Sequence, residues 1–503
     1  MGEIFSTNSK SYMIRSNFEI TRVQSCSHKS RRRHHSTRRF ISKKNIFVSA
    51  LLFQTNSSHG MKASFAQNIH EDILYEFFRH TLPSTIVLGG ILTTSPLNVS
   101  SVCHSWRTVA LERTNLWASI SISLGENEKG ILDAGPRAES ILKYVEMWLR
   151  RSRSSPLQIE LETRTPRTLA DPEMEKVFEV IISEAQRWGD ISLRNVHHHD
   201  QELAVKIDSV HLTSLSLYGH PFSKHPLILN LISSPRIRNL QLANRVIMKI
   251  PDHIRPQISH LAHLGISAAP MQCLDDIVTL LGSSSNLDSL SLTFQHALVP
   301  PSRPEIAARV FARLSELRLT FFESCNTPFA FFISWLTCPA LKSLSVSNYR
   351  RVEAEHAWDG LEEIDRFLQR SHAPISDLRI RYDELPSSLF SEAQRQRIQA
   401  AFVQIIRRLE HLEVLELDFV LVCNELIEAL NVIRGDACCP ALKSFSLFTS
   451  GVALEQRTVW DMVESRRSSG CPLKDIFLDV PSFTSDFEKE INELTYISSN
   501  TSQ

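Results

Sequence analysis

The sequence lacks the short motifs through which many enzymes bind phosphates, metals or acyl groups. Its 15 glycines form neither G-x-G-x-x-G nor G-x-x-x-x-G-K-[ST], so no phosphate-binding loop is evident. It contains no G-x-S-x-G turn and no H-E-x-x-H helix. We therefore expect no catalytic residues, no cofactor and no metal, and a function other than that of an enzyme. A hydrolase or transferase with an unrecognised site remains a minor alternative.

Cysteines are few, and long apolar runs are missing. The nine cysteines are odd in number and irregularly spaced, and none forms C-x-x-C, which favours reduced thiols inside the cell. No apolar run approaches the roughly 20 residues that a membrane-spanning helix needs. The run near the start, Ile46 to Phe53, is far too short. We expect a soluble protein of the cytoplasm, the nucleus or both, with no membrane partner.

The sequence contains one dense cluster of metal-binding residue types, His197-His198-His199-Asp200. Neighbouring residues on an extended segment point to opposite sides, so at most two of them can share a metal ion. We interpret this cluster as a polar loop.

Charge is balanced over the chain but not along it. Lysine plus arginine and aspartate plus glutamate each total 55, yet residues 1–66 hold twelve basic and two acidic residues. The remainder therefore carries 43 basic and 53 acidic residues, a net charge of −10. We expect no nucleic-acid partner for this mildly acidic part.

The basic segment, residues 1–66, is rich in serine and arginine and shows no sustained apolar period, which predicts disorder. Its cluster Arg31 to Lys44 is compatible with a solvated tail, a nuclear import signal or an anionic-surface contact. A mitochondrial presequence, N-myristoylation at Gly2 and an extension of the gene model before Met61 remain open.

Two short apolar helices are predicted between Ile69 and Ile122. Ile69, Ile73 and Phe77 recur at helical spacing beside Leu74 and Phe78. A second stripe contains Val102, Trp106, Val109 and Ala110. Asn68 is a candidate N-cap for the first helix. Two helices of this size bury little surface alone, so they need a further surface to pack against.

This stretch resembles an F-box. The family has Leu-Pro, an acidic residue, Ile-Leu, a hydrophobic pair, Val-Cys, Trp-Arg, Ala and Leu-Trp in order. Those places hold Ile69-His70, Asp72, Ile73-Leu74, Phe77-Phe78, Val102-Cys103, Trp106-Arg107, Ala110 and Leu116-Trp117. The chain is most similar in character to the expanded F-box family of mushroom-type fungi, in which a segment like Met147 to Leu157 follows.

The resemblance implies a substrate-recognition adaptor of an SCF-type ubiquitin ligase. It implies binding to a Skp-type adaptor, and through it to cullin, by Ile69, Ile73, Leu74, Phe77, Phe78, Val102 and Trp106. Two alternatives remain open. The chain can be a repeat-based binding scaffold that acts outside a ubiquitin ligase, or the helical unit can simply cap the repeats that follow.

From Trp188 onward the pattern apolar-x-x-apolar-x-apolar occurs eleven times, at intervals of 24 to 37 residues, for example at Leu287, Leu290 and Leu292. This is the leucine-rich-repeat range, stretched toward the C-terminus. The last two apolar residues lie on one face of a short strand and point inward. Helices are expected between strands, for example over Asp275 to Leu281 and Leu361 to Leu368.

The predicted fold is therefore α/β, a helical F-box followed by an irregular leucine-rich-repeat solenoid with parallel strands on the concave side and helices outside. Predicted segments are a basic tail (1–66), the F-box (67–122), a helical linker (123–155), the solenoid (156–490) and a tail (491–503). Strand residues that point away from the core are candidates for binding an unidentified protein substrate; these are Ser216, Gln241, Ser291, Arg318 and Ser345.

Overall fold

The computed structural model describes residues 69–82, 86–88, 96–124, 138–163, 172–196, 203–220, 225–244, 246–249, 258–267, 274–294, 309–321, 326–348, 359–382, 391–418, 422–432, 438–448, 454–480 and 483–500. The predictions on the basic segment and on residues 197–200 lie outside these ranges. Within them, no helix is long and apolar enough to cross a membrane. The chain divides into two compact units, Met1–Ser84 with Leu92–Leu116, and Thr85–Ile91 with Trp117–Gln503.

The first unit is helical. Its helices are α3 (Glu71–Thr81), α4 (Pro96–Val99) and α5 (His104–Glu112). Helix α3 starts after His70, whose Nδ1 accepts a hydrogen bond from the Asp72 backbone N–H at 3.4 Å. His70, rather than the candidate Asn68, is therefore the N-cap of this helix. Glu71 and Asp72 place negative charge in the first turn, which stabilises the helix because the N-terminal end of the helix dipole is positive.

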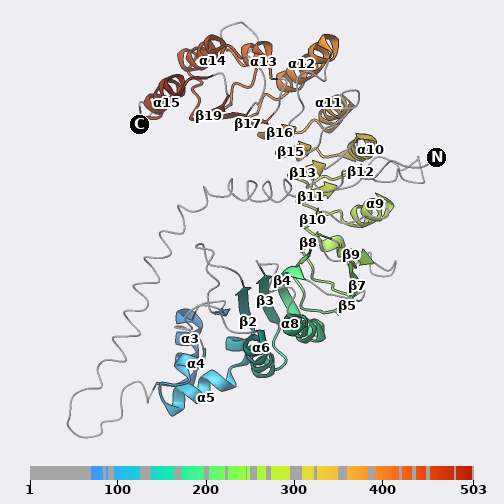
Figure 1. Cartoon of the computed structure of the whole chain (residues 1–503), viewed down its shortest axis with the longest axis vertical. Coiled ribbons are helices and arrows are strands. Elements are labelled where there is room, and N and C mark those ends of the chain that lie inside the picture. Colours follow the sequence, from blue (N-terminus) through green and yellow to red (C-terminus); the bar gives the residue numbers. More distant parts are fainter. Residues whose placement is uncertain are drawn as a thin grey trace, which may run out of the picture. The chain divides into compact units, whose positions relative to one another are not determined.

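The second unit contains a parallel sheet, which in the described part of the chain has 14 strands that neighbour one another in sequence order (Figure 1). The strands are β1 (Ile86–Leu88), β2 (Ser119–Leu124), β3 (Leu157–Thr163), β4 (Trp188–Val196), β6 (Ser214–Gly219), β8 (Asn239–Ala243), β10 (His263–Ser267), β11 (Ser289–Phe294), β13 (Glu316–Phe321), β15 (Ser343–Asn348), β16 (Asp377–Tyr382), β17 (Val414–Asp418), β18 (Ser444–Phe448) and β19 (Asp475–Asp479).

The repeated apolar pattern predicts this sheet correctly from β4 onward. All eleven predicted strands form, and their inward residues pair in register, as Leu290 with Leu317 and Leu292 with Leu319. Both pairs are almost completely buried. Polar residues between them face the other side, which we call the open face. The period of two therefore separates a continuous apolar core from a mostly polar surface.

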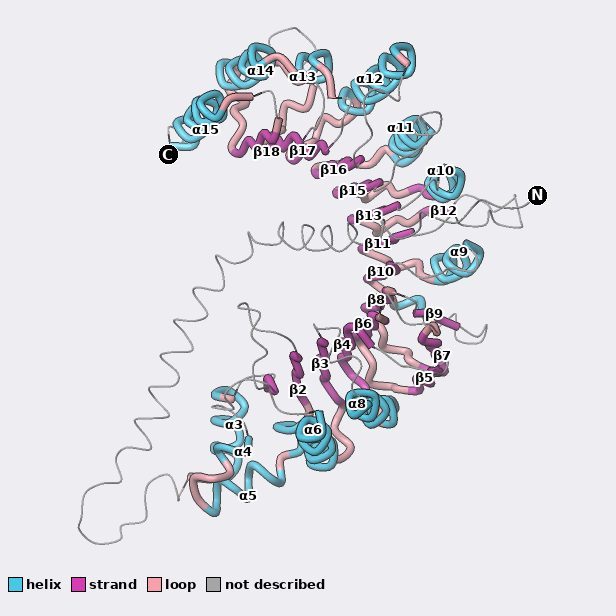
Figure 2. Tube along the Cα trace, viewed as in Figure 1, coloured by secondary structure: helices cyan, strands magenta, loops and turns pink. Residues whose placement is uncertain are grey.

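Helices lie on one side of the sheet (Figure 2). They are α6 (Ala138–Ser152), α8 (Pro172–Ser183), α9 (Leu274–Ser283), α10 (Asn326–Trp335), α11 (Asp359–Ser371), α12 (Glu392–Arg407), α13 (Asn424–Ala429), α14 (Gln456–Ser468) and α15 (Ser485–Asn500). The predicted helices at Asp275 to Leu281 and Leu361 to Leu368 are confirmed within α9 and α11. The described architecture is α/β with parallel strands, compatible with a repeat-like fold.

Between β4 and β10 the expected outer helices are replaced by strands in the described residues. Strands β5 (Leu203–Asp208), β7 (Leu227–Ser233) and β9 (Val246–Lys249) form a separate three-stranded parallel sheet. Val205 and Ile207 are buried, as are Leu229 and Leu231, so alternate residues of this small sheet contribute to the core. Another short parallel pair joins β12 (Arg309–Val310) to β14 (Leu336–Thr337).

Described elements near the predicted linker (123–155) group with the body. Strand β2, helix α6 and strand β3 all belong to the second unit. Trp117 and Trp148 are both buried and meet edge to face at 4.7 Å, which fastens α6 to the start of β2. Helix α15 runs from Ser485 to Asn500 and so crosses the boundary predicted at residue 490.

Arginines join the ends of neighbouring helices in the second unit. The last carbonyl groups of a helix have no partner inside it, and a cation near them is favourable. Here the guanidinium comes from the helical segment that follows in the chain. The bonds are Arg187 Nη1 to Leu149 O at 3.5 Å, Arg370 Nη2 to Ile333 O at 2.8 Å and Arg466 Nη1 to Leu430 O at 2.7 Å.

Candidate functional site

The core of the helical unit is aromatic. Leu74, Phe78 and Trp106 are at most 3% exposed, and Val109 and Ala110 complete the buried cluster. Phe78 packs edge-on against Trp106, with ring centroids 5.1 Å apart. Leu74, Phe78 and Trp106 were predicted to contact the adaptor, but in this structure they are interior residues that hold the two helices together.

The outer side of α3 carries the other predicted contacts. Ile73 is 65% exposed, while Ile69 and Phe77, one helical turn before and after it, are half-buried. The Phe77 ring lies 6.1 Å from the buried Trp106 ring, so its position is supported from inside. Val102 is also half-buried at the edge of the cluster. These residues give the small helical unit an apolar stripe with one prominent side chain.

Charged residues border this apolar stripe and form ion pairs. The Arg113 Nη2 atom lies 2.6 Å from Asp72 Oδ1, and its guanidinium stacks 5.0 Å from the centre of the Tyr75 ring. Glu76 pairs with Arg79 on the next turn at 3.4 Å. These pairs are exposed and contribute at most about 1 kcal/mol each to stability. They place charged groups next to Ile73 along α3, at Asp72 and Glu76.

The open face brings the predicted substrate-binding residues into one row. Backbone pairing places Ser216 opposite Gln241, Ser291 opposite Arg318, and Arg318 opposite Ser345. Gly265 stands between Gln241 and Ser291 in the same row. The predicted set is therefore continuous across neighbouring strands except for this one glycine, which leaves the middle of the row without a side chain.

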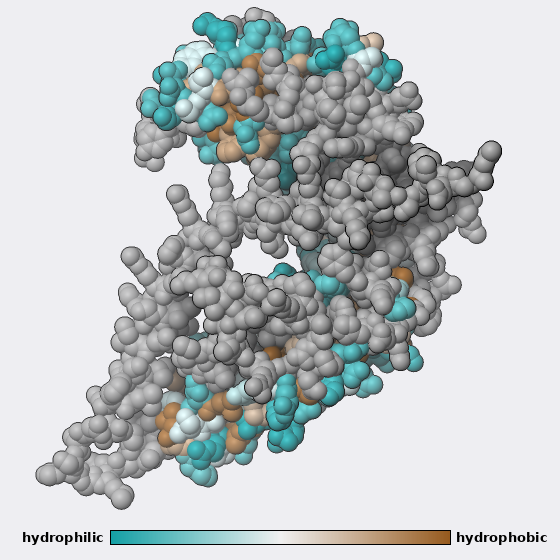
Figure 3. Space-filling view, viewed as in Figure 1, coloured by the Kyte–Doolittle hydropathy of each residue, from teal (hydrophilic) through white to brown (hydrophobic). Residues whose placement is uncertain are grey.

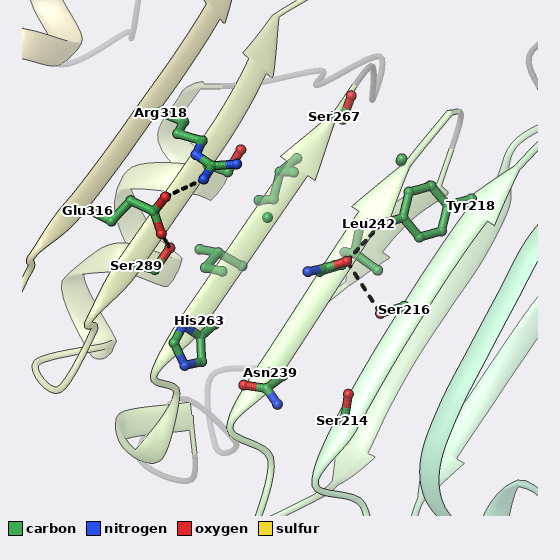
Figure 4. A pocket seen from close by; sticks show the side chains of 16 residues that line it. Ser214, Ser216, Tyr218, Asn239, Leu242, His263, Ser267, Ser289, Glu316 and Arg318 are labelled. Carbon is green, nitrogen blue, oxygen red and sulfur yellow. Dashed lines mark hydrogen bonds and ion pairs between the residues drawn. The ribbon is translucent and has the colours of Figure 1, made fainter. Parts of the chain in front are cut away.

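A groove of about 510 Å³ lies over β6, β8, β10, β11 and β13 (Figure 4). Four of the five predicted residues line it, and Ser345 does not. Further lining residues include Ser214, Tyr218, Asn239, His263, Ser267, Ser289 and Glu316. They lie two positions before or after this row. Ser214, Asn239, Ser289 and Glu316 are among the outward-facing strand residues that the period of two predicts for substrate recognition, and extending the row in the same way would have identified Tyr218, His263 and Ser267.

Hydrogen bonds organise the polar groups of the groove. Tyr218 donates its hydroxyl to Gln241 Oε1 at 2.7 Å, and Ser289 donates to Glu316 Oε2 at 3.0 Å. Glu316 also pairs with Arg318 at 2.5 Å. The remaining surface offers hydroxyl and amide groups with little formal charge. This arrangement is suited to hydrogen bonding with a peptide or another neutral polar ligand.

Charges reappear beyond the groove, and they are paired there. Arg379 donates from Nε and Nη2 to the two Asp377 carboxylate oxygens at 3.0 Å each. The hydrogen bond to Asp377 raises the pKa of Arg379, and the charge of Glu416 adds to the effect. Arg381 in turn binds Glu416. Strands β16 and β17 thus carry a largely self-neutralised network.

Figure 3 shows the hydropathy of the described surface, on which teal residues predominate.

Comparison with known proteins assigns no family, because no family model and no curated protein matches this chain. In the described residues, no group of three or more His, Cys, Asp or Glu side chains is placed to hold a metal ion. The two candidate binding surfaces of the chain are the Ile73 stripe and the open face of the sheet.

Proposed function

We propose that this protein is a substrate-recognition adaptor of an SCF-type ubiquitin ligase. The helical unit acts as an F-box that binds a Skp-type adaptor, and the body acts as a leucine-rich-repeat-like solenoid that binds a protein substrate. The observation that carries the proposal is the exposed Ile73 on α3, on a helical unit with an aromatic core of its own. The resemblance of Ile69 to Trp117 to the F-box pattern supports the same assignment.

The buried residues and the exposed stripe have different roles in this proposal. Leu74, Phe78 and Trp106 hold the shape of the unit, and Ile73 with Phe77 enters an apolar groove of the adaptor. Burying an isoleucine side chain contributes about 1.5–3 kcal/mol, which makes Ile73 the expected centre of the interface. The charged pairs around it form the rim.

The body supplies recognition rather than bond chemistry. The groove over β6 to β13 offers hydrogen-bonding side chains across several strands, as a surface for a polypeptide requires. Holding the substrate near a ubiquitin-conjugating enzyme raises its effective concentration, and correct placement alone can lower a reaction barrier by several kcal/mol. Cullin would join through the Skp-type adaptor.

The experiment compares Ile73→Asp with Val310→Asp. Val310 is a matched control because it is 62% exposed and lies in the other unit. With purified full-length chain and a Skp-type adaptor, Ile73→Asp should weaken capture at least tenfold while circular dichroism stays unchanged. Val310→Asp should bind as the wild type does. Equal capture by both variants, or no capture by the wild type, would refute the F-box assignment. Capture of the adaptor without cullin would favour a scaffold that acts outside a ligase.

A further inference from the structure

Two aromatic side chains interrupt the polar open face at its C-terminal end. Phe448 on β18 and Phe477 on β19 have ring centroids 5.0 Å apart. Phe477 is 53% exposed, and it occupies the position that holds Ser291 on β11 and Ser446 on β18. Apolar surface appears among hydrophilic residues at this end of the unit (brown, top of Figure 3). Phe448 itself is half-buried, so the pair presents one exposed ring supported by a second one, and exposed apolar surface on a polar face is a typical feature of a binding site.

Carboxylates surround the two rings. Asp475 and Asp479 lie two residues before and after Phe477 on the same face, and both are exposed. Asp479 is also the register partner of Phe448, and Asp418 is its partner on the other side. Unlike the acids of β16 and β17, Asp475 and Asp479 form no ion pair with any described residue. No arginine or lysine occupies an open-face position of β18 or β19.

A small cavity of about 130 Å³ adjoins the rings at the end of the sheet. It is lined by Phe477, by the inward-facing Ile476 and Leu478 of the same strand, and by Glu488 and Ile491 of α15, so apolar and polar groups both border it. The complement of an aromatic and aliphatic surface edged by carboxylates is a side chain with an apolar stem and a positive end. Arginine and lysine have that structure, and both bind over aromatic rings.

We infer that Phe448, Phe477, Asp475 and Asp479 form a site for an arginine- or lysine-bearing segment of a partner protein. The cation lies over the exposed ring and between the two aspartates, and its apolar stem packs against the two rings. This inference rests on the proposed function in one respect, because the partner is then the substrate of the ligase. The neutral groove over β6 to β13 contacts a different part of the same partner.

The test uses fluorescence anisotropy with the full-length chain and a labelled twelve-residue peptide of four Gly-Ser-Arg repeats. The control peptides contain citrulline or glutamate in place of arginine. The arginine peptide should bind, and added salt should weaken the binding. Phe477→Ala should weaken it at least tenfold, and so should Asp475→Asn with Asp479→Asn. The matched control, Glu160→Gln with Asp190→Asn, removes two exposed carboxylates from β3 and β4 of the same face and should change binding less than twofold.

Three results would overturn the inference. They are no saturable binding of the arginine peptide at millimolar concentration, equal binding of the citrulline peptide, and equal weakening by the Glu160 and Asp190 control. A dimer in light scattering that Phe477→Ala dissolves would instead assign the rings to a second copy of the chain. Adaptor capture, measured on the same preparations, separates the two proposals. Peptide binding without adaptor capture refutes the ligase assignment alone, whereas capture without peptide binding refutes this site alone.

Discussion

Arg466 offers a sharp test of how the helices of the body are held together. It lies in the last turn of α14 and is fully buried. Its guanidinium donates to the backbone carbonyls of Leu430 and Cys439, and more distantly to that of Cys438. Burial lowers the pKa of Arg466, and the nearby cysteines oppose this shift. We predict that Arg466→Ala destabilises α13 and α14 and leaves the helical unit unchanged.

The magnitude follows from the groups left behind. A hydrogen bond to a charged group contributes about 1.5–3 kcal/mol, and a buried acceptor without a partner costs about 1–3 kcal/mol. Removing the buried charge returns part of its desolvation cost, so these values do not simply add. We expect Arg466→Ala to lose about 3–5 kcal/mol, the range measured when one partner of a buried charged pair is removed. Arg466→Met keeps most of the side-chain volume and should lose less.

Hydrogen exchange measured by mass spectrometry is the appropriate assay because it reports the stability of each segment separately. Exchange should accelerate in α13 and α14 of Arg466→Ala. Arg467→Ala is the matched control, since this neighbouring arginine is partly exposed and pairs with Glu464 at 3.7 Å. It should change stability by less than about 1 kcal/mol. If the two variants exchange alike, the carbonyl bonds of Arg466 are not what joins these helices.

Three further predictions concern the body. Arg370→Ala should accelerate exchange in α10 and lower the free energy of unfolding by about 1.5–3 kcal/mol. This is less than the loss expected for Arg466→Ala, because Arg370 is only half-buried. Equal losses in the two variants would contradict the dependence on burial. Gly219→Ala should lower the free energy of unfolding by about 1–3 kcal/mol, because its Cβ would lie 2.0 Å from the Asn244 backbone oxygen. Gly265→Ala, whose Cβ would come no closer than 3.4 Å to Gln241, is its control in urea titration, and equal losses would refute the steric argument. Burial raises the pKa of the Cys338 and Cys439 thiols from 9.0 to about 12, so the folded state disfavours the thiolates. Their contribution to stability should be complete below pH 9 and decline between pH 9 and 12, by about 1.4 kcal/mol per pH unit and thiol. Melting temperatures from pH 8 to 11 would check this, and Cys338→Ala should flatten the decline; an unchanged profile in that variant would contradict it.

The sequence allowed the large sheet to be predicted because its signal is local. Two apolar residues at i and i+2 define the inward face of a strand without knowledge of its neighbours. The same spacing occurs at Trp117, Ile120 and Ile122, at the end of the segment that resembles an F-box (67–122), and these residues lead into strand β2 of the second unit. For strand β5, the local spacing and the expected repeat architecture predict different structures. Val205 and Ile207 alternate as in a strand, but a leucine-rich repeat leads one to expect a helix there.

The candidate surfaces were less predictable. Ile73 and Leu74 belong to adjacent stripes of one short helix, and the sequence does not say which stripe faces α5. Ile73 is exposed and Leu74 is fully buried, so the two apolar neighbours have opposite roles. On the sheet, the period of two predicts which side chains face away from the core. Gln241 and Arg318 could therefore be assigned to the open face from the sequence. The bonds of Arg466 depend on helix spacing and leave no pattern in the sequence.

The small sheet of β5, β7 and β9 has a consequence for the groove. Neighbouring strands are about 4.8 Å apart, whereas packed helices need roughly 10 Å. Where helices back the large sheet, the outer layer is wider than the inner one and forces the strands to fan out. Behind β6 and β8 both layers have the same spacing, so this stretch can stay flat. The groove lies partly over that stretch, and we expect it to meet a straight, extended polypeptide better than a compact, rounded one.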